Sequence, residues 1–186
     1  MWPFLYFAGD RLSTAELTAA RLDGDVVEIG EGFMPADAVE TRELRAASLR
    51  VFIRDTLAVT HASAAWVHGA LALPPSPHVV QRISARRIHH VLDTRLRYRD
   101  VRLPPADVMH ISGLAVATPV RTLVDLVREA VGEGADAATV EAMCAWRPEL
   151  IAAAIAWLEE AKPLPYKRPA LAHLRERQEV VTRYTS

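Results

Sequence analysis

One stretch of the chain concentrates arginine, the residue best suited to holding phosphate. Residues 78–102 carry seven arginines against two aspartates, a net charge of +5, although the whole chain has a formal net charge of -1. A guanidinium group matches phosphate oxygens in bidentate geometry. The stretch therefore indicates a surface that binds a polyanion such as nucleic acid. The alternative is a sheet edge that is kept soluble by its charge.

Strand geometry predicts which of these arginines act together. Successive side chains of a strand point to opposite faces, so Arg95, Arg97 and Arg99 would share one face, while Leu96 and Tyr98 would turn to the core. We expect basic residues near the C-terminus to help. The predicted nucleic-acid contacts are Arg82, Arg86, Arg87, Arg95, Arg97, Arg99, Lys167 and Arg168.

The sequence offers little for catalysis. It has no Walker loop, no G-x-G-x-x-G after a strand, no H-E-x-x-H and no G-x-S-x-G. Residues 160–162 have the acid-x-lysine form of nuclease metal sites, but they stand at an expected helix end before Pro163, so we favour a solvated helix end. We expect a protein that is not an enzyme and needs no cofactor.

The histidines do not predict a metal site. His61 and His68 share a helix face, but no third ligand stands at a suitable spacing, so burial beside Trp66 is the preferred interpretation. His89 and His90 are adjacent and would point to opposite faces of a strand.

A helix after residue 118 has the clearest local signals in the chain. Thr118 is a suitable N-cap, and Pro119 stands at the first helical position, where its missing N–H costs nothing. Arg121 and Asp125 are four residues apart, so we expect an ion pair that fixes this helix against the sheet.

Composition sets the class of protein. The chain has 186 residues, 51% of them hydrophobic, which is enough for one generous domain or two small ones. Its one cysteine, Cys144, excludes an internal disulfide and fits a reducing compartment, so we expect a cytoplasmic location. No segment has the length of a membrane span, and the apolar start is too short for a signal peptide.

Periodicity and caps predict an α+β fold, with a degenerate winged-helix-like N-terminal part followed by a mixed sheet packed by helices. We place an abbreviated winged-helix-like region at 1–40 and an α+β domain with C-terminal helices at 41–186. Expected helices cover 14–22, a segment from 42, 60–69, 119–131, 137–145, 149–161 and 170–181. Expected strands cover a hairpin at 26–34, then 79–84, 88–92, 95–101, 108–111 and 114–117.

Two motifs resemble those of a known family. The stretch GLAVATPVRTLVDL at 113–126 and the HASAAWVHG element at 61–69 are similar to landmarks of AbiEi-type antitoxins of type IV toxin–antitoxin systems, especially short actinobacterial forms. The resemblance covers most of the chain. It implies a transcriptional autorepressor with an N-terminal winged helix that reads DNA, and a C-terminal domain that counters a nucleotidyltransferase-like toxin.

The sequence departs from this pattern at its front. Family winged helices fit a recognition helix between the first helix and the wing, whereas this chain has only residues 23–25 there. Residues 1–45 also carry nine acids against four arginines, a net charge of -5 that suits DNA poorly. Two hypotheses follow: a DNA-binding regulator that uses the arginines above, or a protein-interaction module that has lost sequence-specific DNA reading.

Overall fold

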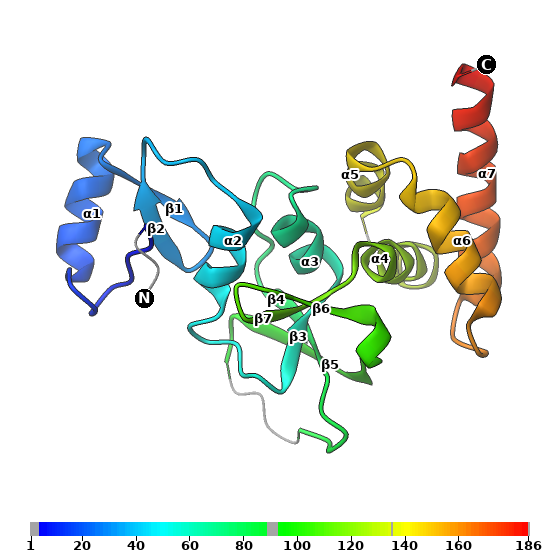
Figure 1. Cartoon of the computed structure of the whole chain (residues 1–186), viewed down its shortest axis with the longest axis horizontal. Coiled ribbons are helices and arrows are strands. Elements are labelled where there is room, and N and C mark those ends of the chain that lie inside the picture. Colours follow the sequence, from blue (N-terminus) through cyan, green and yellow to red (C-terminus); the bar gives the residue numbers. More distant parts are fainter. Residues whose placement is uncertain (1–3, 89–92, 135, 186) are drawn as a thin grey trace.

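The computed structural model describes residues 4–88, 93–134 and 136–185. Three parts follow one another along the long axis of the molecule, as Figure 1 shows. An N-terminal lobe holds α1 and a two-stranded hairpin, a central part holds α2, α3 and a five-stranded sheet, and a C-terminal part holds α4 to α7. The expected α+β class is confirmed.

The N-terminal lobe begins with α1 (Thr14–Asp23), which is fixed by local hydrogen bonds. Ser13 and Glu16 form the expected capping box, and Gly24 ends the helix in a left-handed conformation. The chain then enters the hairpin of β1 (Val26–Ile29) and β2 (Gly32–Pro35) directly. In this described segment there is no helix between α1 and β1, as the short spacing predicted.

The central sheet has the strand order β5-β4-β3-β7-β6 and is mixed. The pairs β3–β4 and β6–β7 are antiparallel, while β4–β5 and β3–β7 are parallel. The strands are β3 (Leu57–Val59), β4 (His78–Arg82), β5 (Leu96–Arg102), β6 (Val108–Ile111) and β7 (Leu114–Ala117). Strand β3 was not predicted, and the expected strand at 88–92 lies outside the described residues except for Ile88, which is irregular.

The β6–β7 hairpin turns on two residues. Ser112 and Gly113 both have positive φ, 52° and 80°, and Ile111 pairs with Leu114 across them. A two-residue loop with this backbone gives the flanking strands the right-handed twist that a sheet needs. The Ser112 hydroxyl also donates to the Glu43 carbonyl, which ties the turn to α2 (Arg42–Leu49).

The helices after the sheet begin and end close to their expected positions, with two differences. They are α4 (Pro119–Glu133), α5 (Ala137–Trp146), α6 (Leu150–Glu160) and α7 (Lys167–Thr185). Gly132 was expected to break α4 but lies inside it, where the Tyr166 ring packs on the space that a Cβ would fill. Helix α7 begins at Lys167, before the expected residue 170, because Pro169 is tolerated in a first helical turn.

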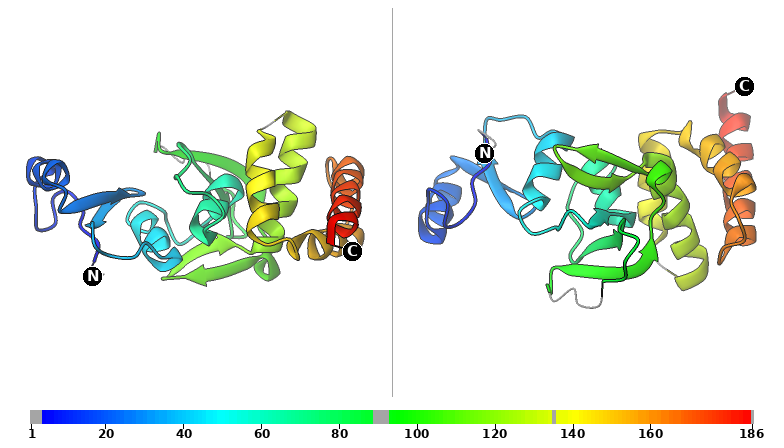
Figure 2. Two further views of the ribbon diagram at one scale, coloured as in Figure 1. Left: turned by 90° about the horizontal axis from the view of Figure 1, so that it is seen from above. Right: turned by 60° about the horizontal axis from the view of Figure 1, so that its bottom comes forward.

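Two apolar cores share α3 (His61–His68) as a wall. The sheet core joins the hairpin, α2 and the sheet, and includes Ile29, Leu49 and Trp66. The helix core lies among α4 to α7 and includes Ala65 of α3. The two views of Figure 2 show α4 and α5 standing between the sheet and the last two helices. Within the described residues, no helix is long and apolar enough to cross a membrane.

Candidate functional site

Strand β5 lies at an edge of the central sheet and carries part of the predicted arginine surface. Leu96 and Tyr98 pack against the sheet core as the alternation predicted, and Arg97 and Arg99 take the opposite face. This surface, made of Arg82, Arg86, Arg87, Arg95, Arg97 and Arg99, is called the arginine ribbon below.

Arg97 and Arg99 face α4, whose C-terminal half carries two glutamates one turn apart. Arg97 lies 3.6 Å from both Glu129 and Glu133. Arg99 forms a close ion pair with Glu129 and lies 3.1 Å from Glu133. The Arg99 guanidinium holds the pKa of Glu133 below its usual value, so this carboxylate stays charged at neutral pH. Two arginines of the ribbon are therefore neutralised by the fold.

Arg95 does not face α4 as Arg97 and Arg99 do. It lies one residue before β5, and its guanidinium contacts Asp93 at 2.7 Å and Glu31 of the hairpin turn at 3.1 Å. It also stands 4.2 Å from the centre of the Phe52 ring. Hydrogen bonds from Arg95 lower the pKa of Asp93 to about 2. The predicted row of three guanidinium groups is thus divided, because Arg95 ties the sheet to the N-terminal lobe.

The remaining basic candidates have different settings. Asp100 forms ion pairs with Arg82 at 3.0 Å and with Arg87 at 3.3 Å. Arg86 is exposed, and no ion pair of its side chain occurs among the described residues.

Near the C-terminus, the two basic candidates also differ. The Lys167 ammonium donates to the carbonyl oxygens of Glu159 and Ala161 at the end of α6, where cations are favourable. Arg168 is exposed on the first turn of α7.

A buried ion network stands at the start of α4. Arg121 contacts Asp125 and Asp107, each at 2.8 Å, and Trp157 donates to Asp107 at 2.9 Å. Burial alone would lower the pKa of Arg121, but the two carboxylates outweigh it and the pKa is raised. The predicted Arg121–Asp125 pair is confirmed, while Asp107 and Trp157 were missed because they are distant in sequence. The Thr118 cap and Pro119 are also found as predicted.

The two motif histidines are buried in α3, as expected. His61 has Nδ1 2.9 Å from the Thr60 hydroxyl, and His68 has Nε2 2.8 Å from the Ala117 carbonyl. Burial lowers the pKa of His61 to about 4 and also lowers that of His68. Trp66 is buried as well, but its ring lies 6.1 Å from that of His78, whereas His68 stacks on Trp146.

These observations offer no metal centre in the described part of the chain. No group of three or more histidine, cysteine or acidic side chains there is placed to hold a metal ion. We expected His89 and His90 to point to opposite faces of a strand, but both residues lie outside the described part of the chain. Glu160 and Lys162 stand at the end of α6, as the solvated interpretation of residues 160–162 required.

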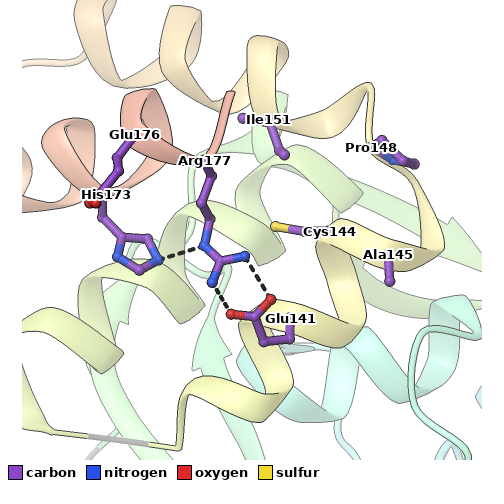
Figure 3. Close-up of a pocket in the computed structure, with 8 residues that line it drawn as sticks. All are labelled: Glu141, Cys144, Ala145, Pro148, Ile151, His173, Glu176 and Arg177. Carbon is purple, nitrogen blue, oxygen red and sulfur yellow. Dashed lines mark hydrogen bonds and ion pairs between the residues drawn. The ribbon is translucent and has the colours of Figure 1, made fainter. Parts of the chain in front are cut away.

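A pocket of about 540 Å³ lies between α5 and α7, with the start of α6 beside it. Figure 3 shows Arg177 reaching from α7 to Glu141 of α5, with His173 beside it. Cys144 lies in the same wall, but burial raises the pKa of its thiol, so it stays protonated and is a weak nucleophile. The pocket can admit an apolar group, but it holds no activated nucleophile.

Comparison with known families decides the assignment. Residues 57–164 match the model of the AbiEi antitoxin C-terminal domain. The chain belongs to this family. The AbiEi domain begins at the first residue of β3 and ends between α6 and α7, so it contains the whole central sheet and both family motifs.

Two further comparisons add little. No curated protein matches the chain. The crystal structure of the RV2827C protein from Mycobacterium tuberculosis is similar, at 18% identity and a TM-score of 0.33, over 88% of this chain and 70% of that one.

Proposed function

We propose that the protein is a non-enzymatic antitoxin-type regulator that acts mainly through contact with a protein partner. The family resemblance implies a nucleotidyltransferase-like toxin as that partner. The observation that carries the proposal is the difference between two regions. The AbiEi domain at 57–164 has a complete sheet covered by helices, whereas α1 is followed at once by the hairpin, with no space for a recognition helix.

Electrostatics supports the same choice. The N-terminal lobe, which would have to approach DNA, belongs to the stretch of residues 1–45 with net charge -5. Arg97 and Arg99, the central residues of the ribbon, already have carboxylate partners on α4. A DNA phosphate would have to compete with Glu129 and Glu133, which are held beside these arginines at high effective concentration.

The test is co-purification with a toxin. The protein would be co-expressed with a nucleotidyltransferase-like protein encoded beside it, and the complex would be measured by size exclusion and calorimetry. We expect a stable complex that also forms with a variant lacking residues 1–40, provided that circular dichroism and a cooperative melt show that this variant folds. Absence of a complex with the full chain at moderate salt would contradict the proposal.

DNA binding is the second candidate, and one observation favours it. Arg86 is exposed, and the Arg87 side chain is 71% exposed, so their loop keeps charge available to phosphates. Fluorescence anisotropy with the protein's own upstream DNA and a scrambled duplex, at low and near-physiological salt, tests it. Preference for the upstream sequence would establish an autorepressor. Binding that weakens steeply with salt but does not prefer the upstream sequence would indicate a surface that contacts only phosphates.

An enzymatic role is the weakest alternative. A nuclease would require a metal site, and incubation with magnesium and plasmid DNA would reveal nicking if one exists. We expect the plasmid to stay intact, because the acid-x-lysine element stands at a helix end, and in the described part of the chain no group of acidic, histidine or cysteine side chains is placed to hold a metal ion.

A further inference from the structure

A second basic site lies away from the ribbon, where the segment between α2 and β3 meets the β6–β7 hairpin. A pocket of about 240 Å³ opens there. Buried or half-buried apolar residues of β3 and β7 form part of its wall. Its polar lining consists of Arg50, Arg54, Asp55 and His110. All four of these residues are exposed at the surface, so the pocket is open to solvent.

The two arginines of this pocket differ from those of the ribbon in their partners. Among the residues that the structure describes, neither the Arg50 nor the Arg54 guanidinium makes a hydrogen bond or an ion pair. Asp55 lines the same pocket but forms no ion pair with either of them in this part of the chain. Two positive charges thus face a small cavity with one carboxylate, and their donors are available.

The backbone of the hairpin turn lies close to one of these arginines. A Cβ built on Gly113 would meet three atoms of the Arg50 guanidinium, with Cζ at 3.0 Å, Nη1 at 3.1 Å and Nε at 3.3 Å. Any larger residue would therefore push the guanidinium away, and the φ of +80° also requires glycine. Gly113 therefore leaves the space beside the pocket that the Arg50 guanidinium occupies.

We propose that this pocket binds a phosphate group. Two guanidinium groups supply paired donors that fit phosphate oxygens, and the His110 imidazole on β6 can donate a further hydrogen bond. Asp55 offsets one charge, so the site stays net positive and suits a dianion better than a carboxylate. The volume is below the roughly 300 Å³ at which sites for whole small molecules begin. A phosphate monoester fits, with its remaining part outside the pocket.

The phosphate has two possible sources: a small phosphate ester such as a mononucleotide, or the backbone of a nucleic acid. The pocket chemistry is the same for both. The proposal does not depend on the toxin partner, so it stands or fails separately from the proposed function. The experiment distinguishes the sources through its choice of probes.

The test is calorimetry with three probes: inorganic phosphate, adenosine 5′-monophosphate and a short DNA duplex. The key variant is Arg50→Ala with Arg54→Ala. Its matched control is Arg21→Ala with Arg175→Ala, which removes the same charge from two exposed arginines outside both the pocket and the ribbon. Losing two charge-assisted contacts should weaken binding about tenfold or more in the first double variant. The control should bind a small phosphate as the unchanged protein does.

Arg50→Lys provides a check that does not alter charge. It keeps the cation but loses the guanidinium fork over Gly113, so we expect an affinity between those of the unchanged protein and the double variant. The proposal is overturned if the unchanged protein binds none of the three probes, or if the two double variants weaken binding equally. Binding of the duplex alone, lost only with Arg50 and Arg54, would assign the site to a nucleic-acid phosphate.

Discussion

The arginine ribbon and the Arg50 pocket both contain arginines, but most of those in the ribbon have carboxylate partners and those in the pocket have none among the described residues. In the ribbon, Arg97 and Arg99 meet Glu129 and Glu133 of α4, and Arg95 meets Asp93 and Glu31. In the pocket, Arg50 and Arg54 face a cavity without such partners in the described structure. The dense run of charge is largely neutralised, whereas the two isolated arginines keep their charge available.

The difference teaches that charge along the sequence is a poor measure of charge on the surface. The carboxylates that neutralise the ribbon come from α4 and from the hairpin turn, far away in the chain. Pairing at such distances depends on the fold, and the fold can also leave a solitary arginine unpaired. If pairing separates structural arginines from binding ones, the paired arginines should matter for stability and the unpaired ones for binding.

The largest effect belongs to the most completely paired arginine. Replacing Arg121 by alanine leaves Asp107 buried without a cation and leaves Asp125 with Arg128 alone, at 3.1 Å, which should lower the free energy of unfolding by about 3–5 kcal/mol. Urea denaturation measures this loss. As a control, Arg21→Ala breaks an exposed pair with Glu28 and should cost less than about 1 kcal/mol. Equal losses in the two variants would show that burial does not set the strength of these pairs.

The next effect concerns pH, at the histidine beside this network. Burial lowers the pKa of His61 in the folded chain to about 4, well below the ordinary histidine pKa of 6.5, so between these pH values the unfolded chain binds a proton that the folded chain does not. Stability should therefore fall as pH drops from about 6.5 to 4, by up to about 1.4 kcal/mol per pH unit from this group.

The matched variant is His61→Asn, because asparagine tolerates the φ of +51° at this position and does not titrate. Denaturation measured between pH 7 and 4 should then show a shallower slope. A slope unchanged from that of the original protein would assign the pH dependence to other groups, such as His68 and His78, whose pKa values burial also lowers.

A smaller effect follows from releasing the ribbon. Replacing Glu129 and Glu133 by glutamine should free Arg97 and Arg99, so DNA binding should strengthen and its logarithmic salt slope should steepen by up to about 2. Anisotropy at several salt concentrations measures both. Glu149→Gln with Glu160→Gln removes the same charge elsewhere and should change affinity much less. No difference between the two double variants would remove the ribbon as a phosphate site.

The smallest effect compares stability across the two regions. Arg97→Ala with Arg99→Ala leaves Glu129, whose side chain is only 10% exposed, without these two cations and should cost about 1–2 kcal/mol. Arg50→Ala with Arg54→Ala breaks none in the described structure and should stay within about 0.5 kcal/mol of the original protein. Thermal or urea unfolding gives both values. A larger loss in the second variant would reveal a structural role for the pocket arginines.

Local sequence signals predicted local structure well. The caps at Ser13 and Thr118, and the glycine after α1, act within a few residues, so they could be interpreted without the fold. Thr60 takes the expected N-cap position of α3, but its side chain makes no capping hydrogen bond, because the hydroxyl contacts His61 instead.

Long-range contacts set the limits of prediction. Gly132 stays inside α4 because Tyr166 packs on it, and the short strand β3 forms because neighbours pair with it on both sides. For the candidate site, the spacing of residues in the sequence predicted the Arg121–Asp125 pair. It also predicted that Leu96 and Tyr98 of β5 turn to the core. The partners of Arg95, Arg97 and Arg99 could not be predicted, since no local rule connects them to Glu31 or α4. The Arg50 pocket was missed because its residues come from separate segments.

The position of β7 in the sheet has a consequence for the order of synthesis. Val59 of β3 pairs in parallel with Val116 of β7, and β7 also lies between β3 and the edge strand β6. The ribosome must therefore release the chain past residue 117 before the middle of the sheet can close, and such distant pairing forms slowly. Until then β3 exposes one unpaired edge, so a nascent antitoxin domain depends on its last strand for protection from aggregation.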